Sequence, residues 1–386
     1  MIVRFQGGTR KCKIELNCSS CVTGQPLNLG LQESAIPVIM VQRPGSHLAP
    51  GGGGHLHGNG GSQGPSWGSG VDLLLPRGWG MPFWQALVYR GARCGGLNEL
   101  QSQAFEGREF LFPNSYPDTA AGRVTELELE KKQVNKYNRI PPAKRPNYTK
   151  LNVISPFKCP WDLLVSGKNS NASNLVNSVS GTGEKKSSHT CYILRSKKAL
   201  RQLQKLLETN QKSANDNLAL DIQVLTEKHT HSLVPVTLSM VHKGTPTQFA
   251  QICLPTSEDM AALEKDRNYG GPVEPQGEDP REQQRHQLKR ELKAKGVKKP
   301  VKLDCSLTVL ADGPGEIRDT GSREVVGYVS AGGFSLGAGV GAGQGFVTTS
   351  TFTRLQDVPR GRQGPLLLVR NTTSLQYRFA RCSVIV

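Results

Sequence analysis

Basic and aromatic side chains are concentrated in residues 131–150, KKQVNKYNRIPPAKRPNYTK, and their types suit contact with RNA. The segment contains seven Lys or Arg and no acidic residue. Cationic groups can meet phosphates, and tyrosine rings can stack on unpaired bases. The prolines favour an extended chain that loses little entropy on binding. The pattern therefore predicts phosphate contacts from Lys131, Lys132, Lys136, Arg139, Lys144, Arg145 and Lys150, with Tyr137 and Tyr148 as stacking rings.

The same segment is compatible with two other interpretations. A run of like charges is often only a solvated surface. The stretch from Ala143 to Pro146 also has the character of a nuclear-import signal. The residues alone leave these alternatives open.

A second group of cations follows the aromatic stretch GWGMPFWQALVYRGARCGGLNE, residues 78–99. Its middle predicts a short buried helix with Pro82 in the first turn, where proline is tolerated. Arg90 and Arg93 follow the apolar run and are candidates for contact with an anion at its rim. The alternative is an aromatic core segment with solvated arginines. Arg378 is a further candidate, because it alternates with ring residues on a predicted C-terminal strand and points away from them.

The bulk composition favours a polyanionic partner. The net charge is +17, from 48 basic and 31 acidic residues, so nucleic acid is the first candidate. The sequence has no apolar run long enough to span a bilayer. Its start lacks a secretory apolar region, which predicts an intracellular protein in which the nine cysteines are free thiols. Cys12, Cys18 and Cys21 supply too few ligands for a structural zinc site, so no metal is expected.

No catalytic residue and no cofactor are predicted. The sequence contains no HExxH motif, no phosphate-binding P-loop and no two-metal carboxylate cluster. Residues 337–342, GAGVGA, fit the dinucleotide fingerprint, but a strand-like FVTTSTF follows where that site needs a helix. These glycines are expected to permit tight turns or close strand packing. Asp72, Asp118 and Asp162 are expected to be isolated cap or turn residues.

Periodicity predicts a mixture of helices and strands. Strands are expected at 36–42 and, buried, at 73–75. A helix should run from a cap at Asp118 or Thr119 to about Asn138. A strand leads into a helix over 191–210, whose leucines should be core. Further elements are a hairpin of 233–244 with 248–255, a Ser-capped helix at 257–266, a strand at 303–310, two strands within 323–352, and strands at 364–370 and 374–386.

Composition changes along the chain predict seven segments. Gly-rich and Ser/Asn-rich stretches mark flexible linkers, and a run rich in Lys and Arg marks a basic one. The segments are 1–35, unassigned; 36–70, a strand and Gly-rich linker; 71–164, a central domain; 165–190, a flexible linker; 191–269, an α+β segment; 270–302, a basic linker; and 303–386, a barrel-like domain.

Four motifs, in order, resemble the largest protein subunit of eukaryotic ribonuclease P and ribonuclease MRP. They are the 78–99 stretch, PPAKRPNY at 141–148, PFKCPW at 156–161 and SLQYRFAR at 374–381. The resemblance spans roughly residues 71–386. The family's protein begins with a basic N-terminal part that has no counterpart here, so this chain looks like a C-terminal portion or a shortened product.

The resemblance implies an RNA-binding scaffold in a complex whose RNA subunit is the catalyst. It would support removal of the 5′ leader from precursor tRNA and processing of precursor rRNA. The implied partners are ribonuclease P RNA, ribonuclease MRP RNA, the other protein subunits and precursor tRNA, without a membrane. The implied location is the nucleus and nucleolus.

The expected fold is α+β with a C-terminal β-barrel. The stretch GYVSAGGFSLGAGVGAGQGFV resembles the barrel hairpin of the glycine-cleavage aminomethyltransferases. A shared fold does not imply a shared function. Two alternatives to the scaffold therefore stay open: a folate-dependent one-carbon transfer enzyme, and a nonfunctional shortened product.

Overall fold

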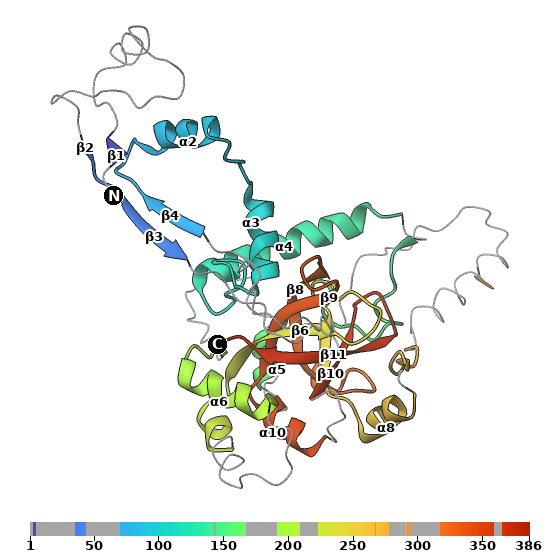
Figure 1. Ribbon diagram of the computed structural model, residues 1–386. Coiled ribbons are helices and arrows are strands. Elements are labelled where there is room, and N and C mark those ends of the chain that lie inside the picture. Colours follow the sequence, from blue (N-terminus) through green and yellow to red (C-terminus); the bar gives the residue numbers. More distant parts are fainter. Residues whose placement is uncertain are drawn as a thin grey trace, which may run out of the picture. The chain divides into compact units, whose positions relative to one another are not determined.

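The structure, a computed structural model, divides the chain into two compact units, residues 1–107 and 108–386 (Figure 1). It describes residues 3–4, 35–43, 70–141, 144–166, 191–208, 223–266, 268–277, 287, 290–291, 294, 317–358 and 365–386. The strand expected at 303–310 and the cysteines Cys12, Cys18 and Cys21 lie outside these residues.

The described residues of the first unit form short antiparallel ribbons and helices. Strand β1 (Val3–Arg4) pairs with β2 (Ala35–Ile36), and β3 (Ile39–Arg43) pairs with β4 (Gly70–Leu74). Helix α2 (Gly80–Tyr89) is followed by α3 (Leu97–Gly107). The strand at 36–42 and the helix around Pro82 are thus confirmed. Helix α2 ends where Gly91 adopts a φ of 89°, a left-handed conformation that glycine accepts at helix ends.

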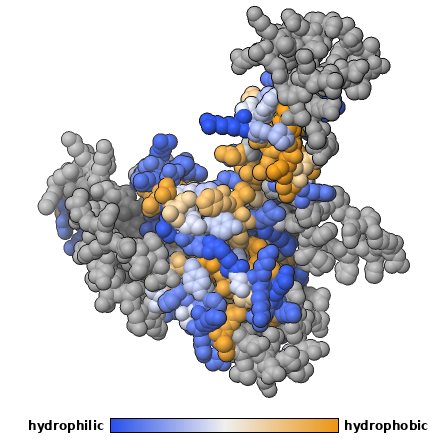
Figure 2. Space-filling view, turned by 90° about the vertical axis from the view of Figure 1, so that its left-hand side faces the viewer, coloured by the Kyte–Doolittle hydropathy of each residue, from blue (hydrophilic) through white to orange (hydrophobic). Residues whose placement is uncertain are grey.

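The burial expected in this unit is wrong. Leu73 and Leu74 are 37% and 53% exposed, and Phe83 is the buried residue of α2. Trp84, in the helix that was predicted to be buried, is 51% exposed. Figure 2 shows hydrophobic residues gathered on the surface of this unit. The helix and the ribbon form from local sequence, but among the described residues of this unit nothing covers most of their apolar faces.

The second unit is built on a closed barrel of six antiparallel strands. These are β6 (Ser232–Met240), β7 (Gln251–Cys253), β8 (Val325–Ser335), β9 (Val340–Thr348), β10 (Leu366–Arg370) and β11 (Tyr377–Val384). Their order is β11-β10-β7-β8-β9-β6, and β6 pairs with β11 to close it. Strand β5 (Tyr192–Ile193) adds to β6 in parallel. An α+β fold with a C-terminal barrel is confirmed, while its likeness to the aminomethyltransferases stays a prediction.

The hairpin expected from β6 and β7 is wrong. Strand β6 pairs with β9 and β11, whereas β7 pairs with β8 and β10. Both edges of β6 are occupied by strands from later in the chain, so β7 finds its partners elsewhere in the barrel. Sequence proximity therefore misidentified the pairing although both strands were located correctly.

Helices pack against the barrel strands. The described residues of this unit form helices α4 (Ala120–Arg139), α5 (Trp161–Ser166), α6 (Lys197–Glu208), α8 (Ser257–Lys265) and α10 (Ser350–Asp357), with a short 3-10 turn at Ile317–Asp319. The cap of α8 is Thr256, in a capping box with Asp259, rather than the predicted Ser257. Strand β9 ends at Thr348 and α10 begins at Ser350, so FVTTSTF is strand only in its first half.

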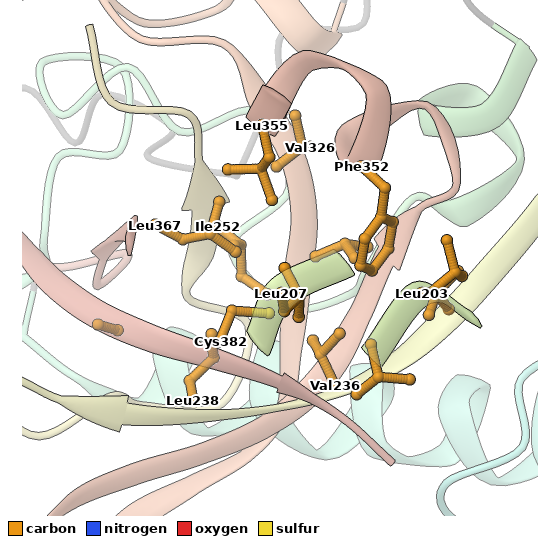
Figure 3. Close-up of a cluster of buried hydrophobic side chains, with 14 of the residues drawn as sticks. Leu203, Leu207, Val236, Leu238, Ile252, Val326, Phe352, Leu355, Leu367 and Cys382 are labelled. Atoms are coloured by element: carbon orange, nitrogen blue, oxygen red, sulfur yellow. The ribbon is translucent and has the colours of Figure 1, made fainter. Parts of the chain in front are cut away.

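Two cores stabilise the barrel. One joins Leu203 and Leu207 of α6 and Phe352 of α10 to strand residues that point toward them (Figure 3), which confirms the leucine stripe as core. The other contains Trp161 of α5, whose ring lies 5.6 Å from that of Phe346. Trp161 is therefore a buried anchor of this core.

Glycines in β8 and β9 permit close approach of neighbouring backbones. A Cβ atom added at Gly345 would lie 2.2 Å from the carbonyl oxygen of Tyr328. One added at Gly327 would lie 2.2 Å from the carbonyl oxygen of Phe346. Within residues 337–342, where the sequence predicted tight turns or close strand packing, Gly339 adopts a φ of 67°, and a Cβ atom added at Gly341 would lie 2.1 Å from the carbonyl oxygen of Gly244, which confirms both roles.

Candidate nucleic-acid interface

Helix α4 (Ala120–Arg139) carries the largest group of predicted RNA contacts. It begins at Thr119, whose hydroxyl accepts a hydrogen bond from the Gly122 amide at 3.0 Å, as predicted. Its inner face holds it to the barrel unit. Leu129 packs against the barrel core, and Glu130 forms an ion pair of 3.5 Å with Lys158. The remaining face of the helix is left to solvent.

The cations of α4 lie on that solvent face. Lys131, Lys132, Lys136 and Arg139 are all exposed. Three of them follow at i, i+4 and i+7, which places Lys132, Lys136 and Arg139 on one side of the helix. Lys136 and Arg139 lie in the last turn, where they also complement the negative C-terminal end of the helix dipole. Lys144 is exposed in the loop beyond, so the row of positive charge continues past the helix.

Arg145 is used within the protein. Its guanidinium donates to the carbonyl oxygens of Asn138 at 2.6 Å and Ile140 at 2.8 Å, and lies 5.4 Å from the centre of the Tyr137 ring. These bonds satisfy acceptors at the C-terminal end of α4, which have no partner inside the helix. Arg145 therefore positions the cationic helix.

Tyr137 and Tyr148 pack against each other and against Phe157. The three ring-to-ring distances are 5.7, 5.5 and 5.5 Å. The Tyr137 hydroxyl donates to the carbonyl oxygen of Pro146 at 3.2 Å, and burial raises the pKa of Tyr148. The rings join the end of α4 to the following loop. The extended conformation expected for the segment is wrong for 131–139, which is helical.

The end of the basic segment is fixed to the barrel by the buried Arg370. Its guanidinium donates to the carbonyl oxygens of Leu151 at 2.5 Å and Asn152 at 3.1 Å. It also donates to the side chain of Gln251 at 2.6 Å. Just before these residues, the half-buried Lys150 accepts a hydrogen bond from the Gly277 amide through its carbonyl oxygen.

Glu274 extends this buried network. It accepts hydrogen bonds from Tyr377 at 2.7 Å, Asn152 at 3.1 Å and Ser322 at 2.5 Å. Burial opposes its charge, but the hydrogen bonds from Ser322 and Tyr377 outweigh this and lower the pKa of Glu274. Sequence reasoning missed the network. The available signal was an arginine that ends the apolar run LLLVR.

The other predicted contacts lie on elements other than α4. Arg90 and Arg93 are exposed in the first unit, where Arg90 is the C-cap of α2. Arg378 is half-buried in β11. Its side chain runs close to glycine backbone, since a Cβ atom added at Gly244 would lie 3.4 Å from its Cγ.

Asp118 is not the isolated residue that the sequence suggested. It accepts two hydrogen bonds from Arg195, at 2.6 and 2.8 Å, and one from the Ile193 amide. Burial opposes its charge, but Arg195 prevails and lowers the pKa of Asp118. The pair joins the loop before α4 to the strand before α6.

Within the described ranges, no three His, Cys, Asp or Glu side chains are grouped so that they could hold a metal ion. None of the helices described there is long and apolar enough to cross a membrane.

Comparison with known proteins identifies two matching family models. Residues 70–161 match the POPLD (NUC188) domain, and residues 232–386 match the POP1 C-terminal domain. The first match spans α2, α3 and α4, and the second contains all six barrel strands.

Three curated proteins are also similar. The chain is 31% identical to the human ribonucleases P/MRP protein subunit POP1, over 94% of this chain and 43% of the human protein. It is 26% identical to popl-1 of Caenorhabditis elegans, over 52% of this chain and 23% of that protein. It is 38% identical to pop1 of Schizosaccharomyces pombe, over 24% of this chain and 14% of that protein.

The chain therefore spans less than half the length of the relatives it matches. Both family models and all three relatives agree with the resemblance seen in the four sequence motifs. The chain belongs to the POP1 family of ribonuclease P/MRP protein subunits.

Proposed function

We propose that this chain is an RNA-binding scaffold in ribonuclease P and ribonuclease MRP. It would support removal of the 5′ leader from precursor tRNA and processing of precursor rRNA, while the RNA subunit performs catalysis. The observation that carries this proposal is the outward row of cations on α4, Lys132, Lys136 and Arg139, on a helix fixed to a closed barrel. A rigid support places the charges without further loss of entropy.

The proposed partners follow from this family and this surface. They are ribonuclease P RNA, ribonuclease MRP RNA, the other protein subunits and precursor tRNA, and the proposed location is the nucleus and nucleolus. Lys131 and Lys144 flank the row and extend the phosphate contact. Arg145, Tyr137 and Tyr148 act on RNA indirectly, by holding α4 and the loop in place.

Salt-dependent binding tests the α4 surface. We expect Lys132→Gln with Lys136→Gln to weaken binding to ribonuclease P RNA and to flatten the plot of log affinity against log salt. Each lost phosphate contact should reduce the slope by about 0.9 in duplex RNA or about 0.7 in a single strand. The measurement is an RNA-binding titration of the whole chain at several salt concentrations.

A charge-compensated variant separates local contact from net charge. Glu258 and Glu264 are exposed acids on α8, so changing both to Gln restores the wild-type net charge. If the α4 surface contacts phosphates, the slope should stay flat in the compensated variant. Recovery of the wild-type slope would contradict the proposed interface.

A further inference from the structure

Helix α6 presents a second cationic face that is separate from α4. Among its described side chains, the exposed ones are all basic: Lys197, Lys198, Arg201 and Lys205. Residues 197–207 contain no acid, and the one acidic residue of the helix is Glu208 at its C-terminal end. Lys197, Arg201 and Lys205 follow at i, i+4 and i+8, which places them along one side of the helix, about 6 Å apart along its axis.

The opposite face of α6 is fixed in the barrel core. Leu200, Leu203, Leu206 and Leu207 are each at most 4% exposed. The side chain of Gln204 accepts a hydrogen bond of 2.7 Å from the Val384 amide of β11. The helix therefore cannot turn its charged side away from solvent, and the cations keep fixed positions on the unit.

Fold stability does not explain this distribution of charge. Like charges at i and i+4 destabilise a helix by about 0.2–0.5 kcal/mol per pair, whereas alternating Glu and Lys would stabilise it. Lys197 with Arg201, and Arg201 with Lys205, are two such like-charged pairs. Solubility does not need them either, since the chain already carries a net charge of +17.

The positive charge on the outer face of α6 is complementary to a polyanion. Residues 197–208 contain no aromatic residue on which a base could stack, so the contact is with phosphates. We propose that the outer face of α6 binds the phosphate backbone of an RNA segment, as a second RNA-binding surface of the barrel unit. This inference rests on the proposed function, because it takes RNA as the physiological polyanion.

The two helices lie on different sides of the barrel strands (Figure 1). The RNA on α6 is therefore a different segment from the RNA on α4. With both surfaces occupied, the barrel acts as a rigid spacer between two segments of RNA. Since backbone contacts carry no sequence information directly, the α6 contact is independent of sequence.

The test uses the whole chain and a short RNA hairpin, titrated at several salt concentrations. Lys197→Gln with Arg201→Gln removes two exposed charges, and glutamine keeps a helix propensity close to that of lysine. We expect the salt slope to fall by about 1.8, or about 0.9 per phosphate. Adding Glu258→Gln and Glu264→Gln restores the wild-type net charge, and the slope of log affinity against log salt should stay at its lowered value. Thermal unfolding of each variant verifies that the fold is intact.

Two outcomes overturn the inference: an unchanged slope, or a slope that returns to the wild-type value when net charge is restored. The α4 variant, titrated in parallel, separates this inference from the proposed function. If the slope changes only in the α4 variant, the second surface is absent and the proposed function stands. If it changes only in the α6 variant, the inference stands and the α4 interface fails.

Discussion

The two units of this chain use the same kinds of apolar residues with opposite results. In the barrel, Val236, Ile252 and Leu367 are fully buried. In the β3–β4 ribbon of the first unit, Ile39 is 65% exposed and Val71 is 50% exposed. A closed barrel gives each strand two partners and two covered faces, whereas a two-stranded ribbon is marginally stable by itself. Stability should therefore be concentrated in the barrel unit.

The largest expected difference concerns aromatic side chains. Phe346 is 0% exposed, and its ring lies 5.0 Å from that of Phe110. We expect Phe346→Ala to lower the free energy of unfolding by about 3–5 kcal/mol. Trp84→Ala, in the first unit, should change it by about 0.5 kcal/mol or less. Urea unfolding of the whole chain measures both. An equally large loss from Trp84→Ala would mean that its apolar face is covered.

A buried arginine of the barrel and an exposed arginine of the first unit give a second comparison. Arg370→Met leaves the carbonyl oxygens of Leu151 and Asn152 without their donor. We expect a loss of about 2–3 kcal/mol, since a buried polar group without a partner costs about 1–3 kcal/mol. Arg90→Met changes an exposed residue of the first unit and should stay within about 0.5 kcal/mol. Comparable effects of the two substitutions in thermal unfolding would contradict the buried network.

Glycine substitutions in the two units should give a smaller difference in stability. Gly345→Ala forces a Cβ atom to 2.2 Å from a carbonyl oxygen and should cost about 1–3 kcal/mol through overpacking. Gly80 of α2 has no heavy atom within 4 Å of an added Cβ. Gly80→Ala should therefore be neutral or stabilising by up to about 1 kcal/mol, through helix propensity. If denaturant unfolding shows Gly345→Ala to be harmless, the close approach of β8 and β9 is wrong.

A last expected effect is the pH dependence that Glu126 of α4 gives to the barrel unit. Burial raises the pKa of Glu126 from 4.5 to about 7, and Glu130 and Asp162 add to this, while the Cys159 amide and Lys158 oppose it. The folded state then binds more protons than the unfolded state, so stability falls as pH rises from 4.5 to about 7.

Glu126→Gln should flatten that part of the stability curve, as measured by thermal unfolding over a pH series. Glu128→Gln removes an exposed carboxylate from the same helix and controls for net charge. If the curve of Glu126→Gln keeps the wild-type slope between pH 4.5 and 7, burial of the carboxylate is not its cause.

The spacing of apolar residues predicted where helices and strands form better than it predicted what packs against them. The leucines of α6 recur at helical spacing, so both the helix and its buried face could be predicted. Helix α2 was also predicted correctly. Its burial was not, because burial depends on what lies opposite, and sequence spacing contains no such information. The pairing of β6 failed for the same reason, since β9 and β11 come from more than a hundred residues later.

In the candidate interface, too, some features could be predicted from the sequence and others could not. Exposure of Lys132 and Lys136 follows from their spacing on an amphipathic helix. The internal roles of Tyr137 and Arg145 depend on Phe157 and on the C-terminal end of α4, which are brought together only by the fold. The cations of α6 could be read from the sequence. That they share one solvent-facing side of the helix became clear only from the burial of the opposite face.

The most direct test is binding of the whole chain to its organism's own ribonuclease P RNA and to an unrelated folded RNA at several salt concentrations. A scaffold with cationic helices fixed on a barrel should prefer its own RNA, and the preference should survive at high salt, because the shape of the surface selects the partner. Equal binding of both RNAs that disappears as salt rises would mean that net charge alone acts, and would contradict the account.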